Sequence, residues 1–145
     1  MQILSAHHAH LPQIVALLQQ DYSKANQALG RDYYTTDYDK LFAITEQRLQ
    51  TPESKYHYFI FQDQEEIKGL LLLYHSGRKG EVLMLTFQDE ETEQNWIQKF
   101  LEFGINFLKE KGASFVTFES APYESTYQSL LEKLNAQPLS TKRIL

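Results

Sequence analysis

The spacing of apolar residues switches along this chain between a helical and a strand period, and this alternation restricts the folds that it can adopt. From Leu11 to Gln20 the apolar residues stand at positions 11, 14, 15, 17 and 18, which predicts a helix. Pro12 is compatible with the first turn, where backbone amides have no partner within the helix. The same spacing extends to Gly30, and a second helix is predicted over 39–50.

Strand character dominates the middle of the chain. Residues 56–61 (YHYFIF), 67–75 (IKGLLLLYH) and 81–87 (EVLMLTF) are aromatic or aliphatic runs joined by short polar turns. Three strands with such connections predict an antiparallel meander. A further short strand is predicted over 2–6, ahead of the first helix.

The last part of the chain alternates again. A long helix with a broad apolar face is predicted over 90–111, with Gly112 as its left-handed cap and a strand over 113–120 after it. A helix over 123–134 and a terminal strand ending at Leu145 complete the order β-α-α-β-β-β-α-β-α-β. We expect an α/β (α+β) fold, in which helices flank one mixed, mainly antiparallel sheet.

Composition restricts the function. The 145 residues include no cysteine, which excludes disulfides, thiolate metal sites and a cysteine nucleophile. A net charge of −5 argues against nucleic-acid binding, which needs a basic face. The longest apolar run, 70–74, is too short to cross a membrane, and the amino terminus shows no secretion signal. We expect one soluble, cytoplasmic domain over 1–145, with neither nucleic acid nor a membrane as a partner.

Three histidines near the amino terminus are the nearest approach to a metal site. His7, His8 and His10 lack the spacing of a helical ligand pair, and the first acidic residue is Asp21. We therefore expect no metal and interpret them as polar residues before a helix.

Three phrases of the sequence carry a resemblance to a known family. HLPQIVALL, FLKEKGASFVTFES and YQSLLEKLNAQPL, together with the order of elements, resemble the GNAT superfamily of N-acetyltransferases. The resemblance implies transfer of an acetyl group from acetyl-coenzyme A to an amine. It places the cofactor where the strands 81–87 and 113–120 splay apart, with the backbone amides around Leu85, Thr86 and Phe87 holding the thioester carbonyl and the pantetheine arm.

The turn that holds the cofactor pyrophosphate in that family departs from its usual pattern. The family pattern is Arg/Gln-x-x-Gly-x-Gly/Ala, and the corresponding residues here are 92–97, TEQNWI. Asn95 and Ile97 stand at the glycine positions and Trp96 lies between them, so these three are the candidate cofactor contacts. Four carboxylates, those of residues 89, 90, 91 and 93, would oppose a pyrophosphate, although they also suit a helix amino terminus, with Asp89 as the cap.

The resemblance also implies catalytic positions. The family's frequent general acid, a tyrosine, corresponds to Leu131, which cannot transfer a proton; Tyr127, one turn earlier, is the candidate substitute, and Tyr123 is another. A general base could be Glu81 or Glu119, at the ends of neighbouring strands. The alternative is that the tyrosine packs and that the glutamates are solvated.

The acceptor side is predicted between the first two helices, where the family binds its substrate. Tyr33, Tyr34 and Tyr38 suit a pocket, and Asp37 favours an amine, although these tyrosines could simply pack the loop onto the sheet. His75, at a strand end, could also face this site.

Two functions remain open at this point. One is an acetyltransferase that acts on a small amine or peptide. The other is a non-catalytic module of the same fold that binds a ligand or another protein. A surplus of phenylalanine and tyrosine would also support a homodimer.

Overall fold

The computed structural model describes residues 2–118, 124–134, 137–139 and 142–145, together with their side chains except those of 124–127, 137–139 and 142–143. The elements, with η1 a 3-10 helix, are β1 (Gln2–Ser5), η1 (His8–His10), α1 (Leu11–Leu29), α2 (Tyr38–Gln50), β2 (Tyr56–Asp63), β3 (Glu66–Ser76), β4 (Lys79–Phe87), α3 (Glu90–Glu110), β5 (Phe115–Phe118), α4 (Glu124–Lys133), β6 (Gln137–Leu139) and β7 (Lys142–Ile144).

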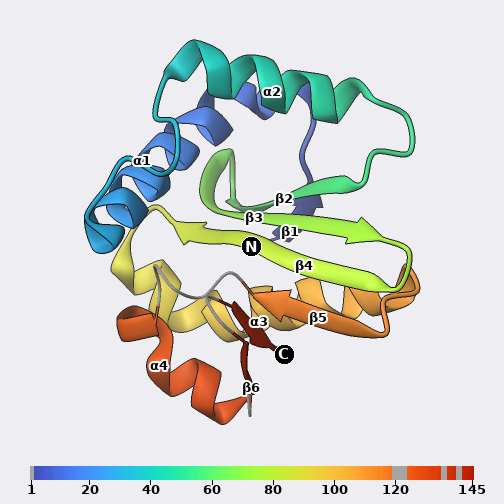
Figure 1. The fold of residues 1–145 in the computed structure, drawn as a ribbon. Helices are drawn as coiled ribbons and strands as arrows, with labels where there is room; N and C mark the ends of the chain where they lie inside the picture. The colour runs from blue at the N-terminus through green and yellow to red at the C-terminus, as the bar shows by residue number, and fades with distance from the viewer. Residues whose placement is uncertain (1, 119–123, 135–136, 140–141) are drawn as a thin grey trace.

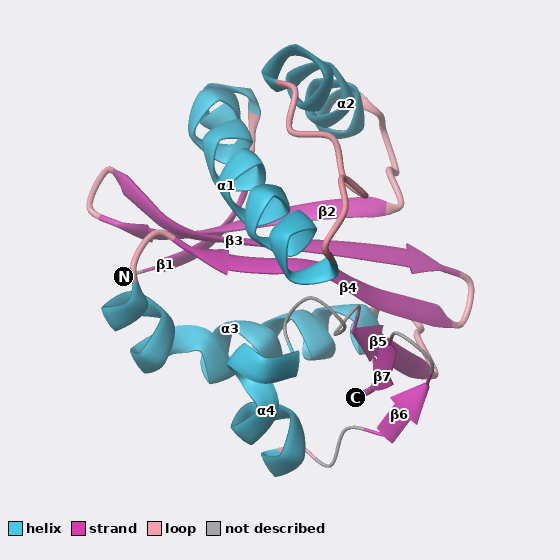
Figure 2. Ribbon diagram, turned by 60° about the vertical axis from the view of Figure 1, so that its left-hand side comes forward, coloured by secondary structure: helices cyan, strands magenta, loops and turns pink. Residues whose placement is uncertain are grey.

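All strands form one sheet in the order β1-β2-β3-β4-β5-β7-β6. Every neighbouring pair is antiparallel except β4 and β5, which are parallel and are connected through α3. Helices α1 and α2 cover one face of the sheet, and α3 and α4 lie on the other (Figures 1 and 2). This arrangement confirms the predicted mixed, mainly antiparallel sheet flanked by helices.

Successive side chains of the central strands point to opposite faces of the sheet, so one apolar core forms on each face. In β3, Leu70 and Leu72 pack toward α1 and α2, whereas Leu71 and Leu73 pack toward α3. All four leucines are at most 2% exposed. This explains the uninterrupted run LLLLY, because a strand covered on both faces needs apolar residues at every position.

The helix ends agree with the expected glycine caps. Gly30 follows α1 with φ +71°, and Gly112 follows α3 with φ +101°. Both angles lie in the left-handed region, which a side chain makes costly. Within the described residues, no helix is long and apolar enough to span a bilayer.

The carboxyl-terminal region differs from the prediction. One terminal strand was expected after Pro138, but β6 and β7 form an antiparallel pair in which Pro138 lies opposite Arg143. Because β6 is an edge strand, a residue without a backbone N–H is tolerated there. The predicted strand 113–120 is described only to Phe118, and residues 119–120 lie outside the described part of the chain.

Candidate functional site

The central strand β4 carries an irregularity in the middle of its length. Its parallel pairing with β5 runs from Lys79, opposite Phe115, to Val82, opposite Phe118, which is the last described residue of β5. Across β3, Leu73 pairs with Val82 and Leu72 with Met84, so Leu83 is an extra residue, a β-bulge. From Met84 to Phe87, β4 still pairs with β3, but no described strand pairs with its other edge. We call the backbone of residues 83–87 on that side the free edge of β4.

A free strand edge inside a sheet offers backbone N–H and C=O groups to an extended ligand. The predicted contacts Leu85, Thr86 and Phe87 all belong to this edge. Their exposed fractions are 0%, 6% and 4%, so their side chains are buried. The geometry therefore leaves them to act through the backbone, which suits the amides of a pantetheine arm and a thioester carbonyl.

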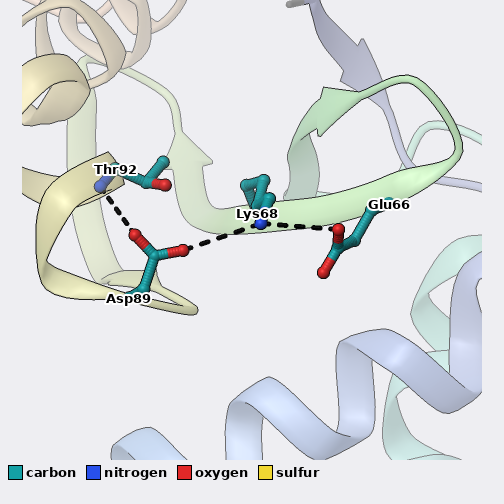
Figure 3. A network of polar contacts seen from close by, with 4 residues as sticks. All are labelled: Glu66, Lys68, Asp89 and Thr92. Carbon is teal, nitrogen blue, oxygen red and sulfur yellow. Dashed lines mark hydrogen bonds and ion pairs between the residues drawn. The ribbon is translucent and has the colours of Figure 1, made fainter.

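The amino terminus of α3 is occupied by its own side chains. Asp89 Oδ1 accepts a hydrogen bond from the backbone N of Thr92 at 2.8 Å. Lys68 Nζ lies 3.7 Å from the other Asp89 oxygen and 3.4 Å from Glu66, as Figure 3 shows. Donation from Thr92, assisted by Lys68, lowers the pKa of the Asp89 carboxyl below its usual value, so this group stays charged.

This helix end does not suit a pyrophosphate. Glu90, Glu91 and Glu93 occupy the first turn beside the Asp89 cap, so the positive end of the helix dipole is already complemented. Lys68 also lines a cavity of about 730 Å³ between α1 and the β2–β3 turn, but the other charged lining residues are acidic: Asp63, Glu65 and Glu66. The negative charge therefore extends to the neighbouring cavity.

The predicted contacts Asn95, Trp96 and Ile97 lie in the second turn of α3. Asn95 is exposed, and Ile97 packs against the α3-side core. The Trp96 ring lies 5.0 Å from that of Phe61 on β2, with Lys99 Nζ 4.8 Å from its centroid. Trp96 is thus directed at the core under α3. These three residues do not reproduce the close backbone approach that glycines provide.

Glu81 lies two residues before the bulge. Strand alternation places it on the α1–α2 face, because its neighbours Gly80 and Val82 face α3. It is 6% exposed and lies beside Thr117 of β5 in the parallel register. The Thr117 Oγ1 atom is buried, and in the described structure it has no hydrogen-bond partner. A buried carboxylate and a hydroxyl without a described partner thus lie side by side on the paired strands β4 and β5.

The loop 30–37 between α1 and α2, which we call the tyrosine loop, is held in place by a residue that sequence reasoning missed. Asn26 is 8% exposed, its Oδ1 accepts from the backbone N of Tyr33 and of Tyr34, and its Nδ2 donates to the Tyr34 carbonyl at 2.9 Å. Its position near the end of α1 gave no distinctive signal. A single side chain therefore shapes the loop that faces the proposed acceptor side.

The three predicted substrate tyrosines differ in their environments. Tyr34 stacks on Tyr22 with ring centroids 4.8 Å apart, and burial raises the pKa of Tyr22. Tyr33 is 60% exposed, and Tyr38 is 41% exposed at the start of α2. Tyr33 and Tyr34 line an open depression of about 580 Å³. Tyr34 thus packs the loop, whereas the other two tyrosines are accessible.

The remaining candidates do not join this group. His75 lies on the α3 face, with its ring 6.2 Å from that of His57, so the sheet separates it from the tyrosine loop. The side chain of Tyr127 lies outside the described part of the structure, as do Glu119 and Tyr123. Among the described residues, no group of three His, Cys, Asp or Glu side chains could hold a metal ion.

Comparison with known proteins identifies the fold. No family model matches the sequence, and no curated protein matches it significantly. A probable acetyltransferase of known structure has a TM-score of 0.74 at 17% identity, covering 97% of this chain and 92% of that one. The PaiA N-acetyltransferase from Thermoplasma acidophilum, solved with coenzyme A, has a TM-score of 0.73 at 14% identity. The match covers 99% of this chain and 97% of that one.

A GNAT-family acetyltransferase from Staphylococcus aureus is similar as well. Its TM-score is 0.70 at 12% identity, covering 96% of this chain and 85% of that one. This chain has the fold of the GNAT acetyltransferases, which confirms the resemblance in element order and phrases. Because function belongs to the site rather than to the fold, the residues around the free edge of β4 carry the functional argument.

Proposed function

We propose that this protein transfers an acetyl group from acetyl-coenzyme A to a small amine. The observation that carries the proposal is the Leu83 bulge in β4, one residue after Val82, which lies opposite Phe118 of β5. A bulge bends its strand and disrupts the ladder locally, so the edge of β4 that follows it can offer backbone groups to an extended ligand. An extended, amide-bearing thioester supplies matching donors and acceptors.

In this reaction acetyl-coenzyme A is a substrate, and its thioester end fits the free edge of β4. A backbone N–H of residues 83–87 would donate to the thioester carbonyl as negative charge develops on it. The amine nitrogen attacks the carbonyl carbon, a C–N bond forms, and the C–S bond breaks. The coenzyme thiolate then takes up a proton, for which Tyr127 remains the candidate donor.

The acceptor side supplies a group that can take a proton from the amine. A protonated amine must lose one proton before it attacks, and the buried Glu81 carboxylate on the α1–α2 face is our candidate to take it. The nitrogen loses a second proton as the amide forms, and this proton balances the one that the coenzyme thiolate takes up. The unsatisfied Thr117 hydroxyl beside it would accept a hydrogen bond from the same amine. Tyr33, Tyr34 and Tyr38 would border the acceptor.

The non-catalytic alternative has one specific observation in its favour. The capped, acidic amino terminus of α3 lacks the phosphate cradle of the family. Under the acetyltransferase proposal, the phosphates therefore contribute little affinity, and binding depends on the free edge of β4. Under the alternative, the chain binds no coenzyme A thioester at all.

A thiol-release assay separates these functions. Because the chain contains no cysteine, a thiol-reactive chromophore reports only the coenzyme A set free. We expect thiol release with at least one primary amine from a panel of mono-, di- and polyamines. Glu81→Gln should lower kcat/KM by about 100-fold or more, whereas Glu102→Gln, on the exposed face of α3, should leave it unchanged. No release with any amine at millimolar acetyl-coenzyme A would support the non-catalytic alternative.

A further inference from the structure

A second cavity lies at the opposite edge of the sheet from the free edge of β4. The backbone N of Ala6 donates to the Tyr58 carbonyl at 2.9 Å, and β1 pairs with no earlier residue of β2. Tyr56 and His57 therefore extend beyond the end of β1. A cavity of about 380 Å³ opens beside them, bordered by the carboxyl-terminal ends of both α2 and α3.

Two cationic side chains line this cavity from opposite faces of the sheet. Arg48, on α2, donates from Nη1 to the Tyr58 hydroxyl at 3.1 Å, and its guanidinium lies 3.7 Å from the Tyr56 ring centroid. This leaves most of its N–H donors unused by those contacts. Lys111, at the end of α3, lies 5.5 Å from the Phe107 ring centroid.

Neither cation is neutralised. Among the described residues, Arg48 and Lys111 form no ion pair, although the chain carries a net charge of −5. Glu53 is the one carboxylate in the lining, and it pairs with neither of them. Glu53 reduces the net side-chain charge of the lining to +1, and the carboxyl-terminal ends of α2 and α3 add partial negative charge. What Arg48 and Lys111 supply is therefore a pair of charged donors for an anion rather than a broad positive surface.

A polar atom without a partner lies at the same place. His57 Nε2 is buried and has no hydrogen-bond partner in the described structure. Its ring contacts Phe107 at 4.9 Å and faces His75 at 6.2 Å. Leaving such a group unsatisfied is costly, so an unpaired buried nitrogen needs an explanation. A ligand oxygen in the cavity would provide its partner.

We propose that this cavity is a binding site for a small organic anion, whose carboxylate or phosphate lies between Arg48 and Lys111 and accepts a hydrogen bond from His57 Nε2. The aromatic rings of Tyr56 and Phe107 border the same space. This site is separate from the proposed acetyl-transfer site, because it lies at the β1–β2 edge rather than between β4 and β5. A bound anion would connect α2 to the end of α3 and stabilise the folded state.

The site should also respond to pH. The groups facing His57 are Lys111 from α3 and His75 from β3, and Arg48 and Glu53 line the same cavity from the side of α2. Burial, with Lys111 and His75, lowers the pKa of the His57 imidazole, so the empty site holds it neutral near pH 7. An anion favours the protonated ring. Affinity for a carboxylate should therefore increase as the pH falls from 8 to 6.

The test is a titration followed by NMR of the histidine ring protons. Benzoate and inorganic phosphate are added in separate arms at constant ionic strength, with chloride as the reference, and loss of one signal in His57→Gln assigns the resonance. We expect saturable shifts of the His57 signals with at least one of the two anions, and none with chloride. Shifts with only one anion identify the head group that the site accepts.

Matched variants locate the site. Arg48→Gln and Lys111→Gln should each weaken binding by about tenfold, because each removes a charged donor. Lys109→Gln removes the same charge from the same helix end, outside the cavity, and should leave affinity unchanged. His57→Gln keeps a side-chain N–H, so it should still bind benzoate. Its affinity for benzoate should not increase as the pH falls from 8 to 6, and calorimetry measures this affinity.

Two results would overturn the proposal. One is the absence of saturable His57 shifts with both anions at about 50 mM, a concentration at which sites as weak as millimolar are occupied. The other is an equal loss of affinity in Lys109→Gln, which would indicate non-specific attraction. If Arg48→Gln does not fold, Lys111→Gln, which changes an exposed side chain, still decides between the outcomes.

Discussion

Val82 of β4 lies opposite Phe118 of β5, and the bulge at Leu83 follows immediately in β4. The extra residue places two consecutive side chains, Leu83 and Met84, against the same core on the α1–α2 face. Such a bulge bends its strand and increases the local twist. One extra residue within an apolar run thus bends β4 where its free edge begins.

The acidic amino terminus of α3 should limit the affinity for acetyl-coenzyme A. We predict that the double substitution Glu90→Gln and Glu91→Gln raises that affinity by about threefold or more at low ionic strength, because it removes two charges that repel the phosphates. The increase should shrink in about 0.5 M salt, where screening is strong. Calorimetry at the two salt concentrations measures both effects.

The paired control replaces Glu110 with Gln at the other end of the same helix. This change removes a carboxylate from the chain without touching the amino terminus of α3. Because the control removes one charge and the double variant two, a control gain of about half the double variant's gain in binding free energy would mean that only the net charge of the protein matters.

The tyrosine loop should depend on Asn26. We predict that Asn26→Ala lowers the free energy of unfolding by about 1–3 kcal/mol, because it removes the partners of the backbone N–H groups of Tyr33 and Tyr34. Gln27→Ala, at an exposed neighbouring position, should change it by less than about 0.5 kcal/mol. Urea unfolding followed by tyrosine fluorescence and circular dichroism tests both values; similar losses in the two variants would argue against the role of Asn26.

Acid should destabilise the protein partly through His57. Burial, together with Lys111 and His75, lowers the pKa of this imidazole below its ordinary value of 6.5, so the unfolded chain binds the proton more tightly. Stability is therefore present above pH 6.5 and is lost as the pH falls below it. We predict that His57→Gln flattens this acid-side loss between about pH 7 and pH 5.

Thermal unfolding between about pH 7 and pH 5, in buffers that contain chloride but no carboxylate or phosphate, provides the measurement. His8→Gln is the comparison, because His8 is an exposed histidine that lies 3.0 Å from Glu46. It should keep the acid-side loss of the wild type. A His57→Gln profile parallel to that of the wild type would contradict the assignment.

The sequence predicted those features that depend on local pattern. The apolar period located the helices and the central strands, and Gly30 and Gly112 marked two helix ends. The Asp89 cap was also predicted, because a cap and its helix are adjacent in the chain. The order of the elements, together with the three phrases, indicated the GNAT fold.

Features that depend on pairing between distant segments were not predictable in this way. The Leu83 bulge lies within EVLMLTF, where every candidate residue is apolar, and only the register against β3 selects one of them. Lys68 reaches Asp89 because β3 and β4 are neighbours, although 21 positions separate the two residues. The sequence left open whether His75 faces the acceptor or is a surface residue, because its face of the sheet depends on the register between β2 and β3.

The Leu83 bulge can be removed without exchanging the faces of its neighbours. After deletion of Leu83, Val82 would still point toward α3 and Met84 toward α1 and α2, in normal alternation. The straightened strand would then lose the bend and the extra twist that the bulge gives to the free edge of β4. Leu83→Ala, which shortens the side chain but keeps the extra residue, is the matched control.

Calorimetric titration of acetyl-coenzyme A into the wild-type protein, the Leu83 deletion and Leu83→Ala is the most direct measurement, with circular dichroism confirming that each is folded. We predict binding at one site per chain for the wild type and Leu83→Ala, and no detectable heat of binding for the deletion. The account would be contradicted by a wild-type protein that does not bind at millimolar ligand, or by a folded deletion variant that binds equally well.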